Sequence, residues 1–527
     1  MSPTRREALA QLAALAVLPY TRWSVVGSDP LDGTIADYQA GLRTGAWSAA
    51  EVTARALDRC RSDGKAWRAI DALSDTALDD ARAADARRRA GKRRGPLDGV
   101  PVFAKAIYDM NGLPTTASSA EWARLFPEAV HRDALEVARL RVAGAIVLGK
   151  TAADDFAYHG NGTSTHTGQV LNPYDPTGTK TPGGSSAGSA VAVASGMAFA
   201  ALGTDDGGSN RIPAQFTGVV GMKPTFALVP RTGVIPTWPY LDTHGPLART
   251  VADAALLLAA IAGADASDPL ALMASWNGRP LAALRDDALA GARLGIVDAH
   301  VPRAQMTPEA LAMWDRAVSD LRAAGATVES FDAAVTRVDF RDRFADAAKA
   351  RNDVAVDSRS PAVTANALWR YFTGRTGDAK AAIRIGYPAY RAFYDVLPAT
   401  YEECEPLLER PMLDDAAGRS FARSRITVVS ALADSMRAAN VSAMVYPTMP
   451  FNAPRAVDQW PDVRTALGYG NWLGLPEVSV PAGLGADGMP ALNLSVVGLP
   501  GSDARVLSFA HAYERHSRRF VAPPRPA

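Results

Sequence analysis

The chain has 527 residues, of which 48% are hydrophobic and 21% are charged, and these proportions are typical of a globular protein with a sizeable core. Its 56 Lys and Arg residues against 55 Asp and Glu residues leave a net charge of +1, which provides no overall attraction to nucleic acid. The two cysteines and seven histidines form neither a disulfide framework nor a metal-ligand spacing. We therefore expect no metal and no other cofactor.

The N-terminal segment has the features of an export signal. Residues 4–9 read Thr-Arg-Arg-Glu-Ala-Leu, a twin-arginine-like opening, and residues 8–18 form a short apolar run that ends before Pro19. Such a run is too short to span a bilayer but suits the apolar part of an export signal. We predict that residues 1–28 direct export to the periplasm or beyond, the alternative being an N-terminal helix of a cytoplasmic protein. No later segment is a transmembrane candidate, so no stable membrane association is expected.

Helical and extended patterns alternate along the first third of the chain. The expected helices cover residues 35–63, 66–90 and 135–143, and the expected strands cover residues 99–107 and 145–150. An S-x-x-E capping box, Ser48 with Glu51, favours a helix start within the first of these helices. Alternation of this kind predicts an α/β sheet protein.

The middle of the chain changes character. Residues 161–184 are rich in Gly, Thr, Ser, Asn and Pro and are expected to form a loop, followed by a small-residue helix over 189–197 and a buried strand over 198–204. Residues 307–401 are more charged and helical, and strands are expected again at 443–447 and 476–481. We see no repeat and no linker, so residues 29–527 are expected to form one domain with a variable helical region at about 300–410.

A run of glycines and serines, Gly-Gly-Ser-Ser-Ala-Gly-Ser at residues 183–189, is the first candidate site. A phosphate-binding P-loop would need a lysine that this run lacks. The G-x-S-x-G nucleophile elbow is formally present with Ser186 at its centre, but that motif requires a preceding strand. Residues 174–182 are loop-like instead, so the elbow context is not met.

Three separated motifs, taken in order, resemble the amidase signature family. They are Gly-Val-Pro-Val-Phe-Ala-Lys at 99–105, the glycine–serine run at 183–189, and Asp-Asp-Gly-Gly-Ser at 205–209. The resemblance extends from about residue 35 to about residue 514. It implies an α/β fold with a central mixed β-sheet flanked by helices on both faces. It also implies that Ser209 is the nucleophile, that Ser185, after a cis peptide bond, is a proton shuttle, and that Lys105 is the base.

These residue types suit amide chemistry. A serine hydroxyl is a weak nucleophile unless a base removes its proton, and a lysine is a base only when burial lowers its pKa from about 10.4. The apolar neighbours of Lys105 are expected to supply that burial. Backbone amides of residues 206–209 are expected to form the oxyanion hole, namely Asp206, Gly207, Gly208 and Ser209. Supporting roles are expected for Gly184, Ser186, Asp205 and Arg211, the last two as a pair that holds the glycine loop.

The resulting hypothesis is an amidase that cleaves a C–N amide bond through an acyl-enzyme on Ser209. Aryl amides, acylated amines, peptide C-terminal amides and carbamates all remain possible small-molecule substrates, and the enzyme is expected to be a monomer or homodimer. Aromatic residues of the helical region form either a pocket wall or part of the core. Those proposed for the pocket are Trp369, Tyr371, Tyr390 and Tyr394.

Two other functions share this fold and these motifs. One is a glutamine amidotransferase subunit of the tRNA-dependent transamidation type, which would need partner subunits and a cytoplasmic location. The other is a catalytically silent scaffold. Ala106, Asp206 and Asn210 depart from the common family pattern, and Asp206 would disfavour anionic substrates if its side chain pointed into the site.

Overall fold

The computed structural model describes residues 29–271, 284–299, 301–332, 340–463 and 465–525. The predicted export signal at 1–28 lies outside the described residues. Among the helices of the described ranges, none is long and apolar enough to cross a membrane.

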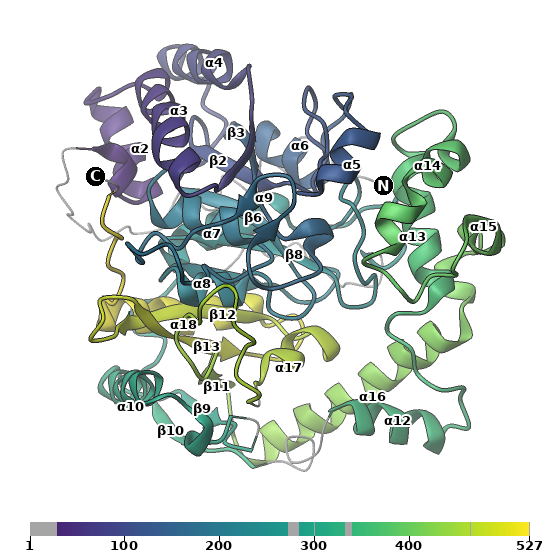
Figure 1. Cartoon of the computed structure of the whole chain (residues 1–527). Coiled ribbons are helices and arrows are strands. Elements are labelled where there is room, and N and C mark those ends of the chain that lie inside the picture. The colour runs from purple at the N-terminus through teal and green to yellow at the C-terminus, as the bar shows by residue number, and fades with distance from the viewer. Residues whose placement is uncertain (1–28, 272–283, 300, 333–339, 464, 526–527) are drawn as a thin grey trace.

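Eleven strands from both halves of the chain form one large mixed sheet (Figure 1) in the order β1-β3-β2-β6-β8-β7-β12-β13-β11-β9-β10. The strands are β1 Ile70–Leu73, β2 Pro101–Lys105, β3 Ile146–Thr151, β4 Thr163–Ser164, β5 Gly168–Gln169, β6 Ala200–Asp205, β7 Val220–Lys223, β8 Thr243–Ala248, β9 Arg293–Ile296, β10 Thr327–Ser330, β11 Ala443–Pro447, β12 Glu477–Leu484 and β13 Pro490–Val497. Of the strands in the described residues, only β4 and β5 lie outside this sheet, as a small antiparallel pair.

Parallel pairing is confined to two parts of the sheet. Strand β2 runs parallel to β3 on one side and to β6 on the other, and β9 runs parallel to β10 and β11. Every other pairing within the sheet is antiparallel. All residues of β2, β3 and β6 are buried, as expected for parallel strands covered on both faces. The polar ends of β2 and β6 are therefore brought together inside the molecule.

Helices cover both faces of the sheet, in agreement with the fold expected from the sequence. They are α2 Ile35–Thr44, α3 Ala49–Ala66, α4 Ala77–Arg89, α5 Ala120–Leu125, α6 Leu135–Val142, α7 Ala187–Ala194, α8 Arg211–Phe216, α9 Val251–Ile261, α10 Pro308–Ala323, α12 Phe340–Ala350, α13 Pro361–Thr373, α14 Ala379–Arg391, α15 Tyr401–Leu408, α16 Ala416–Ala438, α17 Leu467–Trp472 and α18 Asp503–Ser517. Helices α7 and α8 contact one another and strands in the middle of the sheet. Helices α9 and α18 form a second pair that also contacts strands in the middle of the sheet.

Several expected elements are confirmed and others are corrected. The capping box of Ser48 and Glu51 starts α3, and the strand expected at 443–447 is β11. The helix expected over 66–90 is wrong in its first part, because β1 precedes α4 there. Strand β1 is short and only partly buried, so its apolar residues do not form the alternating pattern that would have identified it. The helical region of 307–401 likewise includes a strand, β10.

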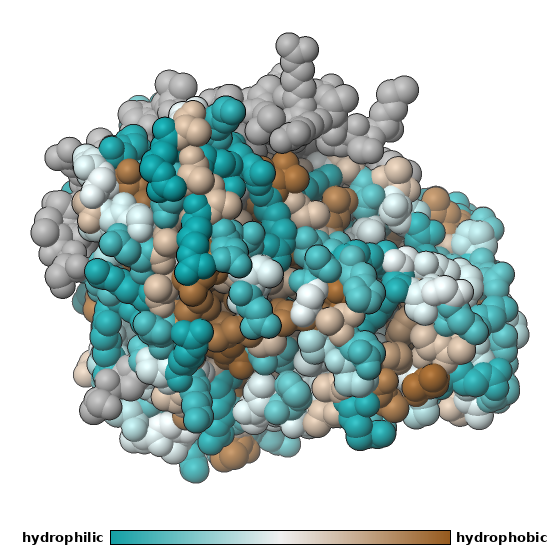
Figure 2. Space-filling view, turned by 90° about the horizontal axis from the view of Figure 1, so that it is seen from above, coloured by the Kyte–Doolittle hydropathy of each residue, from teal (hydrophilic) through white to brown (hydrophobic). Residues whose placement is uncertain are grey.

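The surface seen from above is mostly hydrophilic (Figure 2), and hydrophobic residues gather in a hollow near the middle of this face. The helical region of α12–α15 lies to one side of the sheet (Figure 1). It packs on the rest of the chain through α14 against α5 and α12 against α16.

Candidate active site

Lys105 is the last residue of β2 and is completely buried. Its Nζ lies 2.7 Å from Ser185 Oγ, 3.1 Å from Ser186 Oγ and 2.9 Å from Thr204 Oγ1. Burial lowers the pKa of Lys105 to about 8, although nearby carboxylates, Asp206 foremost, oppose that shift. Within the described chain Lys105 has no carboxylate at ion-pair distance, so its amine contacts hydroxyl groups in place of a counter-ion.

Ser185 lies in the loop before α7, and the peptide bond that joins it to Gly184 is cis. The residue is fully buried, and its hydroxyl contacts Lys105 Nζ. Its carbonyl accepts a hydrogen bond from the Asp154 amide at 3.2 Å. A Cβ atom at Gly184 would collide with the Asp154 carboxylate, which explains why glycine precedes Ser185.

Ser209 lies between the end of β6 and the start of α8. Its relative exposure is 9%, whereas Lys105 and Ser185 have none, so among the three it is the one that solvent reaches. In the described part of the chain the Ser209 hydroxyl makes no hydrogen bond. The Ser186 amide donates to the Ser209 carbonyl at 3.2 Å, and this bond ties the two serine loops together.

Ser186 is enclosed by hydrogen bonds. Its hydroxyl lies 3.2 Å from both Thr204 O and Asn210 Oδ1, between which its single proton is shared, and it accepts from the Thr204 amide. It holds the N-cap position of α7 without a side-chain cap bond, because its hydroxyl faces Lys105 and β6 instead. A buried hydroxyl with these partners supports the loop and is poorly placed to attack a substrate.

Asp205 and Arg211, the pair proposed to hold the glycine loop, lie together beside it. The Asp205 carboxylate accepts from the Gly208 amide at 2.7 Å and from two Arg211 nitrogens at 2.8 and 2.9 Å. Arg211 also pairs with Glu477 at 2.5 Å and donates to Asn471 Oδ1 at 2.6 Å. Arg211 holds the pKa of Asp205 well below its usual range. This buried network joins β6, α8, α17 and β12.

The backbone amides of the loop are not equivalent. The Gly208 amide is engaged by Asp205, whereas the Gly207 and Ser209 amides have no acceptor in the described ranges. A Cβ atom added at Gly207 would meet nothing within 4 Å, while one at Gly208 would collide with Ile212 and Leu467. The open space therefore lies beside Gly207, next to the free amides.

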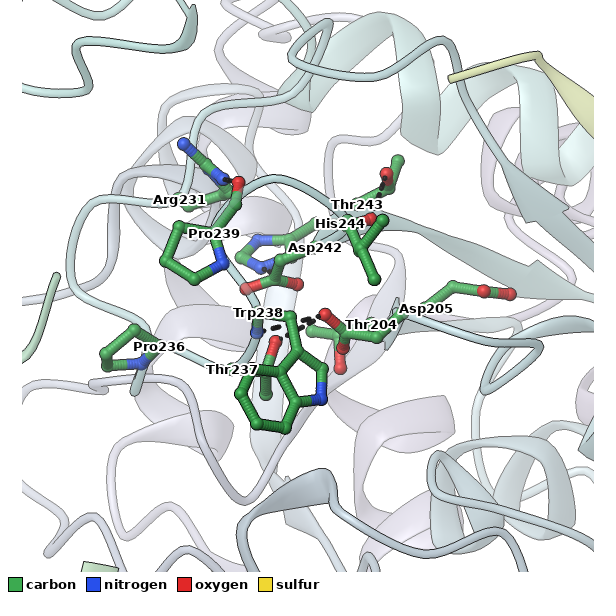
Figure 3. Close-up of polar contacts among 12 residues, drawn as sticks. Thr204, Asp205, Arg231, Pro236, Thr237, Trp238, Pro239, Asp242, Thr243 and His244 are labelled. Atoms are coloured by element: carbon green, nitrogen blue, oxygen red, sulfur yellow. Dashed lines mark hydrogen bonds and ion pairs between the residues drawn. The ribbon is translucent and has the colours of Figure 1, made fainter. Parts of the chain in front are cut away.

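Asp206 and Asn210, the two unusual residues of the motif, have side chains held by hydrogen bonds to neighbouring segments. Asp206 Oδ1 accepts from Thr237 Oγ1 at 2.7 Å and from the Trp238 amide at 3.3 Å. Asn210 donates to Met222 O at 3.0 Å. Figure 3 shows Thr237 and Trp238 on the loop that packs against the end of β6.

The four aromatic residues expected in the pocket fall into two groups. Trp369 and Tyr371 line a cavity of about 540 Å³ together with Arg132, Arg231 and Arg370, and none of the three motif residues lines it. Tyr390 and Tyr394 are fully buried and stack on one another with ring centroids 4.4 Å apart.

The hydroxyls of Tyr390 and Tyr394 donate to the carbonyls of Pro236 and Phe156. These two rings thus fill the core, and Tyr394 meets Trp238 with ring centroids 5.0 Å apart. The helical region therefore reaches the site through the contact of Tyr394 with Trp238. Trp369 and Tyr371 line the separate cavity instead.

The sequence did not single out Thr204 and Asp154. Thr204 adds a third hydroxyl to Lys105, and Asp154 accepts from the amides of Gly162 and Thr163 at 2.9 Å each. Burial raises the pKa of Asp154 to about 6. The position of Thr204, directly before Asp205 at the end of a buried strand, was the signal that could have identified it.

Replacing Asp205 with alanine is expected to destabilise the protein by about 3–5 kcal/mol, because the fully buried Arg211 would lose its main partner. Urea denaturation followed by circular dichroism measures this change. Asp58→Ala is the matched control, since Asp58 pairs with Arg61 on an exposed helix surface and such pairs contribute little. Equal midpoints for the two variants would contradict a structural role for the buried network.

Comparison with known proteins gives one family. The family model described as Amidase matches residues 51–507. A glutamyl-tRNA(Gln) amidotransferase subunit of Symbiobacterium thermophilum is 35% identical over 503 residues, covering 91% of this chain and 96% of the relative. Its mitochondrial counterpart in Ixodes scapularis is 34% identical, covering 84% and 88%. The native peptide amidase from Stenotrophomonas maltophilia is 31% identical with a TM-score of 0.76, covering 94% of this chain and 99% of that structure.

Proposed function

The chain belongs to the amidase family, and we propose that it hydrolyses the C–N bond of a small-molecule amide with Ser209 as nucleophile. In this proposal Ser185 relays the proton and Lys105 is the base. The observation that carries it is the 2.7 Å contact between Ser185 Oγ and a buried lysine amine that has hydroxyl partners and, among the described residues, no counter-ion. An unpaired buried ammonium ion is costly, so the surroundings favour the neutral amine that a base must be.

The pKa of Lys105 sets the fraction of this lysine that is neutral and can act as a base. With a pKa of about 8, about one lysine in ten is neutral at pH 7, against about one in 2,500 at the ordinary value of about 10.4. We propose that Ser209 attacks the carbonyl carbon while its proton passes to Ser185, whose own proton passes to Lys105. Reversal of this relay protonates the leaving nitrogen as the C–N bond breaks, leaving an acyl-enzyme. Water then releases the carboxylic acid by the same route.

The oxyanion of the tetrahedral intermediate needs hydrogen-bond donors that are not already engaged. We propose the amides of Gly207 and Ser209 for this role, with that of Asp206 beside them. The Gly208 amide is left out because it donates to Asp205. The open space beside Gly207 is where the reacting carbonyl would lie.

Aromatic side chains border the two serine loops and support an amide with an aryl or peptidyl group. Trp238 holds Asp206 through its amide and packs against Tyr158 with ring centroids 6.3 Å apart. Trp460 lies 3.4 Å from the Cβ position of Gly160, which in turn lies near Gly184. The likeness to a peptide amidase favours peptide C-terminal amides within this class.

A second function is favoured by the 35% identity to an amidotransferase subunit. In both functions the acyl group passes to water, and they differ in whether the released ammonia is transferred to an acceptor and in the need for partner subunits. Export through residues 1–28 remains a proposal from the sequence alone and would suit the hydrolase.

Ammonia release by the purified full-length chain separates the two functions. We expect release from aryl amides and peptide C-terminal amides by the chain alone, with little from free glutamine, because the aromatic borders favour a large apolar group. A glutamate dehydrogenase-coupled assay across an amide panel measures it. Ammonia release from glutamine and from no other amide of the panel would favour the amidotransferase. No ammonia release from any amide by a folded chain would favour the silent scaffold.

A further inference from the structure

The cavity of about 540 Å³ that Trp369 and Tyr371 line is separate from the proposed catalytic residues, none of which lines it. Its walls come from α13, from residues 231–234 and from residues 409–413. Its volume lies within the usual range for small-molecule sites in proteins. The side chains that line this cavity therefore indicate what kind of molecule it would bind.

Three arginines line this arginine-lined cavity, namely Arg132, Arg231 and Arg370. Arg231 is paired, because its guanidinium lies 2.6 Å from the Asp268 carboxylate. Arg370 is exposed, and one of its nitrogens donates to Ser267 O. Within the described chain no carboxylate lies at ion-pair distance from Arg370, and its other two nitrogens have no acceptor. Arg370 thus has donors free for a ligand.

Arg132 shares its counter-ion with a second arginine. Arg132 Nε lies 3.7 Å from Asp109 Oδ2, and Arg375 lies 3.2 Å from the other oxygen of the same carboxylate. Arg132 Nη2 donates to Tyr371 O at 3.3 Å, next to Arg370 in the chain. A Cβ atom at Gly374 would lie 2.1 Å from Arg132 Nη1, so the guanidinium occupies space that this glycine leaves open. Both Arg132 and Arg370 therefore lie at the C-terminal end of α13.

The arginine-lined cavity carries an excess of positive charge. Four arginines lie in or beside it, and among the described residues only two carboxylates, those of Asp109 and Asp268, lie at ion-pair distance from any of them. Glu409 also lines the cavity, but Lys380 lies 2.9 Å from its carboxylate and balances that charge. A ligand that brings a negative charge is favoured in such surroundings.

Apolar side chains narrow the class of anion. Trp369, Met412 and Leu413 line the same cavity, and Leu413 is 45% exposed. An inorganic anion would leave this apolar surface uncovered, whereas an aromatic or aliphatic group would bury it. A carboxylate suits the arginines, since the planar guanidinium fork matches its two oxygens.

We infer that the arginine-lined cavity is a binding site for an organic carboxylate with an aromatic or apolar body, held by Arg132 and Arg370 and separate from Ser209. The acid that the proposed hydrolysis releases is one member of this class, and this last point rests on the proposed function.

The site adjoins the loop that reaches the candidate active site. Arg231 donates to Pro239 O, and the preceding residue, Trp238, donates its amide to Asp206 at 3.3 Å. Figure 3 shows Arg231, Pro239 and Trp238 along this loop. A smaller cavity of about 60 Å³, also lined by Arg231 and Arg370, reaches Pro239. The two sites are therefore neighbours that share no described lining residue of the catalytic motifs.

Isothermal titration of the full-length chain with benzoate, an aromatic carboxylate, tests the inference. Benzoate is expected to bind the wild type and also the protein whose Ser209 has been blocked with a fluorophosphonate. Benzyl alcohol, which lacks the charge, is expected to bind at least about tenfold more weakly. Arg370→Gln and Arg132→Gln are each expected to weaken benzoate binding by about tenfold or more, because each removes charge-assisted hydrogen bonds.

Arg55→Gln is the matched control. Arg55 is an exposed arginine of α3 with no ion pair in the described chain, and its replacement is expected to leave the benzoate affinity unchanged. Circular dichroism checks the fold of each variant. If Arg132→Gln does not fold, Arg370→Gln decides alone, since an exposed side chain is replaced there.

Absence of benzoate binding, wild-type affinity in the folded arginine variants, or equal affinity for benzyl alcohol would overturn the inference. Loss of benzoate binding once Ser209 is labelled would also overturn it, because the acid would then occupy the active site. The arginine variants need no turnover. They decide on this cavity even if Ser209 fails to react with the probe, which is the result that would overturn the proposed function.

Discussion

Replacing Ser209 with alanine is expected to lower kcat for amide hydrolysis by about 10⁴–10⁶-fold, because loss of a nucleophile removes the covalent route and leaves only binding and oxyanion stabilisation. The variant is expected to fold normally, since the Ser209 hydroxyl makes no hydrogen bond within the described chain and the residue is 9% exposed. Steady-state kinetics with the best substrate of the amide panel measure the loss, and thermal unfolding checks the fold.

Ser186→Ala is the matched control for Ser209→Ala. It removes the hydroxyl that contacts Lys105, Thr204 and Asn210, so it is expected to destabilise the protein by about 1–3 kcal/mol while keeping the nucleophile. Ser209→Ala is therefore expected to lose activity without losing stability, whereas Ser186→Ala is expected to lose stability and keep the nucleophile. A fully active Ser209→Ala protein, or one no less active than Ser186→Ala, would contradict the assignment.

Replacing Lys105 with methionine is expected to lower kcat/KM by at least about 10²–10⁴-fold, the usual contribution of a general base. The wild-type profile gives a second expectation. Since only neutral Lys105 accepts a proton, and burial lowers its pKa to about 8, the rate should rise about tenfold per pH unit below that value and level off above it.

The same pH series on the variant provides the control. Lys105→Met should retain only a slow reaction without the acid limb near pH 8, because the group that titrates has been removed. Lys105→Arg should be equally inactive, since a guanidinium stays protonated. An unchanged acid limb in Lys105→Met would show that another group is titrating and that Lys105 is not the base.

The sequence predicted the parts of the site that depend on short-range order. Lys105 ends a buried strand and Ser209 follows another, and the two strands pair in parallel in the sheet. Motifs that are far apart in the chain therefore lie at the C-terminal ends of neighbouring strands. Gly184 and Gly208 are glycines because a Cβ would collide with a neighbour, which is a local requirement that a motif records.

The parts that depend on long-range packing could not be predicted. Thr237 and Trp238 lie on an irregular loop between β7 and β8, which has no periodic pattern to show that it would meet Asp206. Trp369 and Tyr371 were expected in the pocket because they are aromatic, but residue type does not say what a helix face meets, and they line a separate cavity. The unusual aspartate at 206 was evident, whereas its hydrogen-bond partners Thr237 and Trp238 were visible only in three dimensions.

The assignment of Ser209 is tested most directly by peptide mapping of the wild type and Ser209→Ala after treatment with a fluorophosphonate probe. The account predicts one labelled peptide, modified at Ser209, and no label in the variant. Label on Ser186, or no label on a folded wild-type protein, would contradict it.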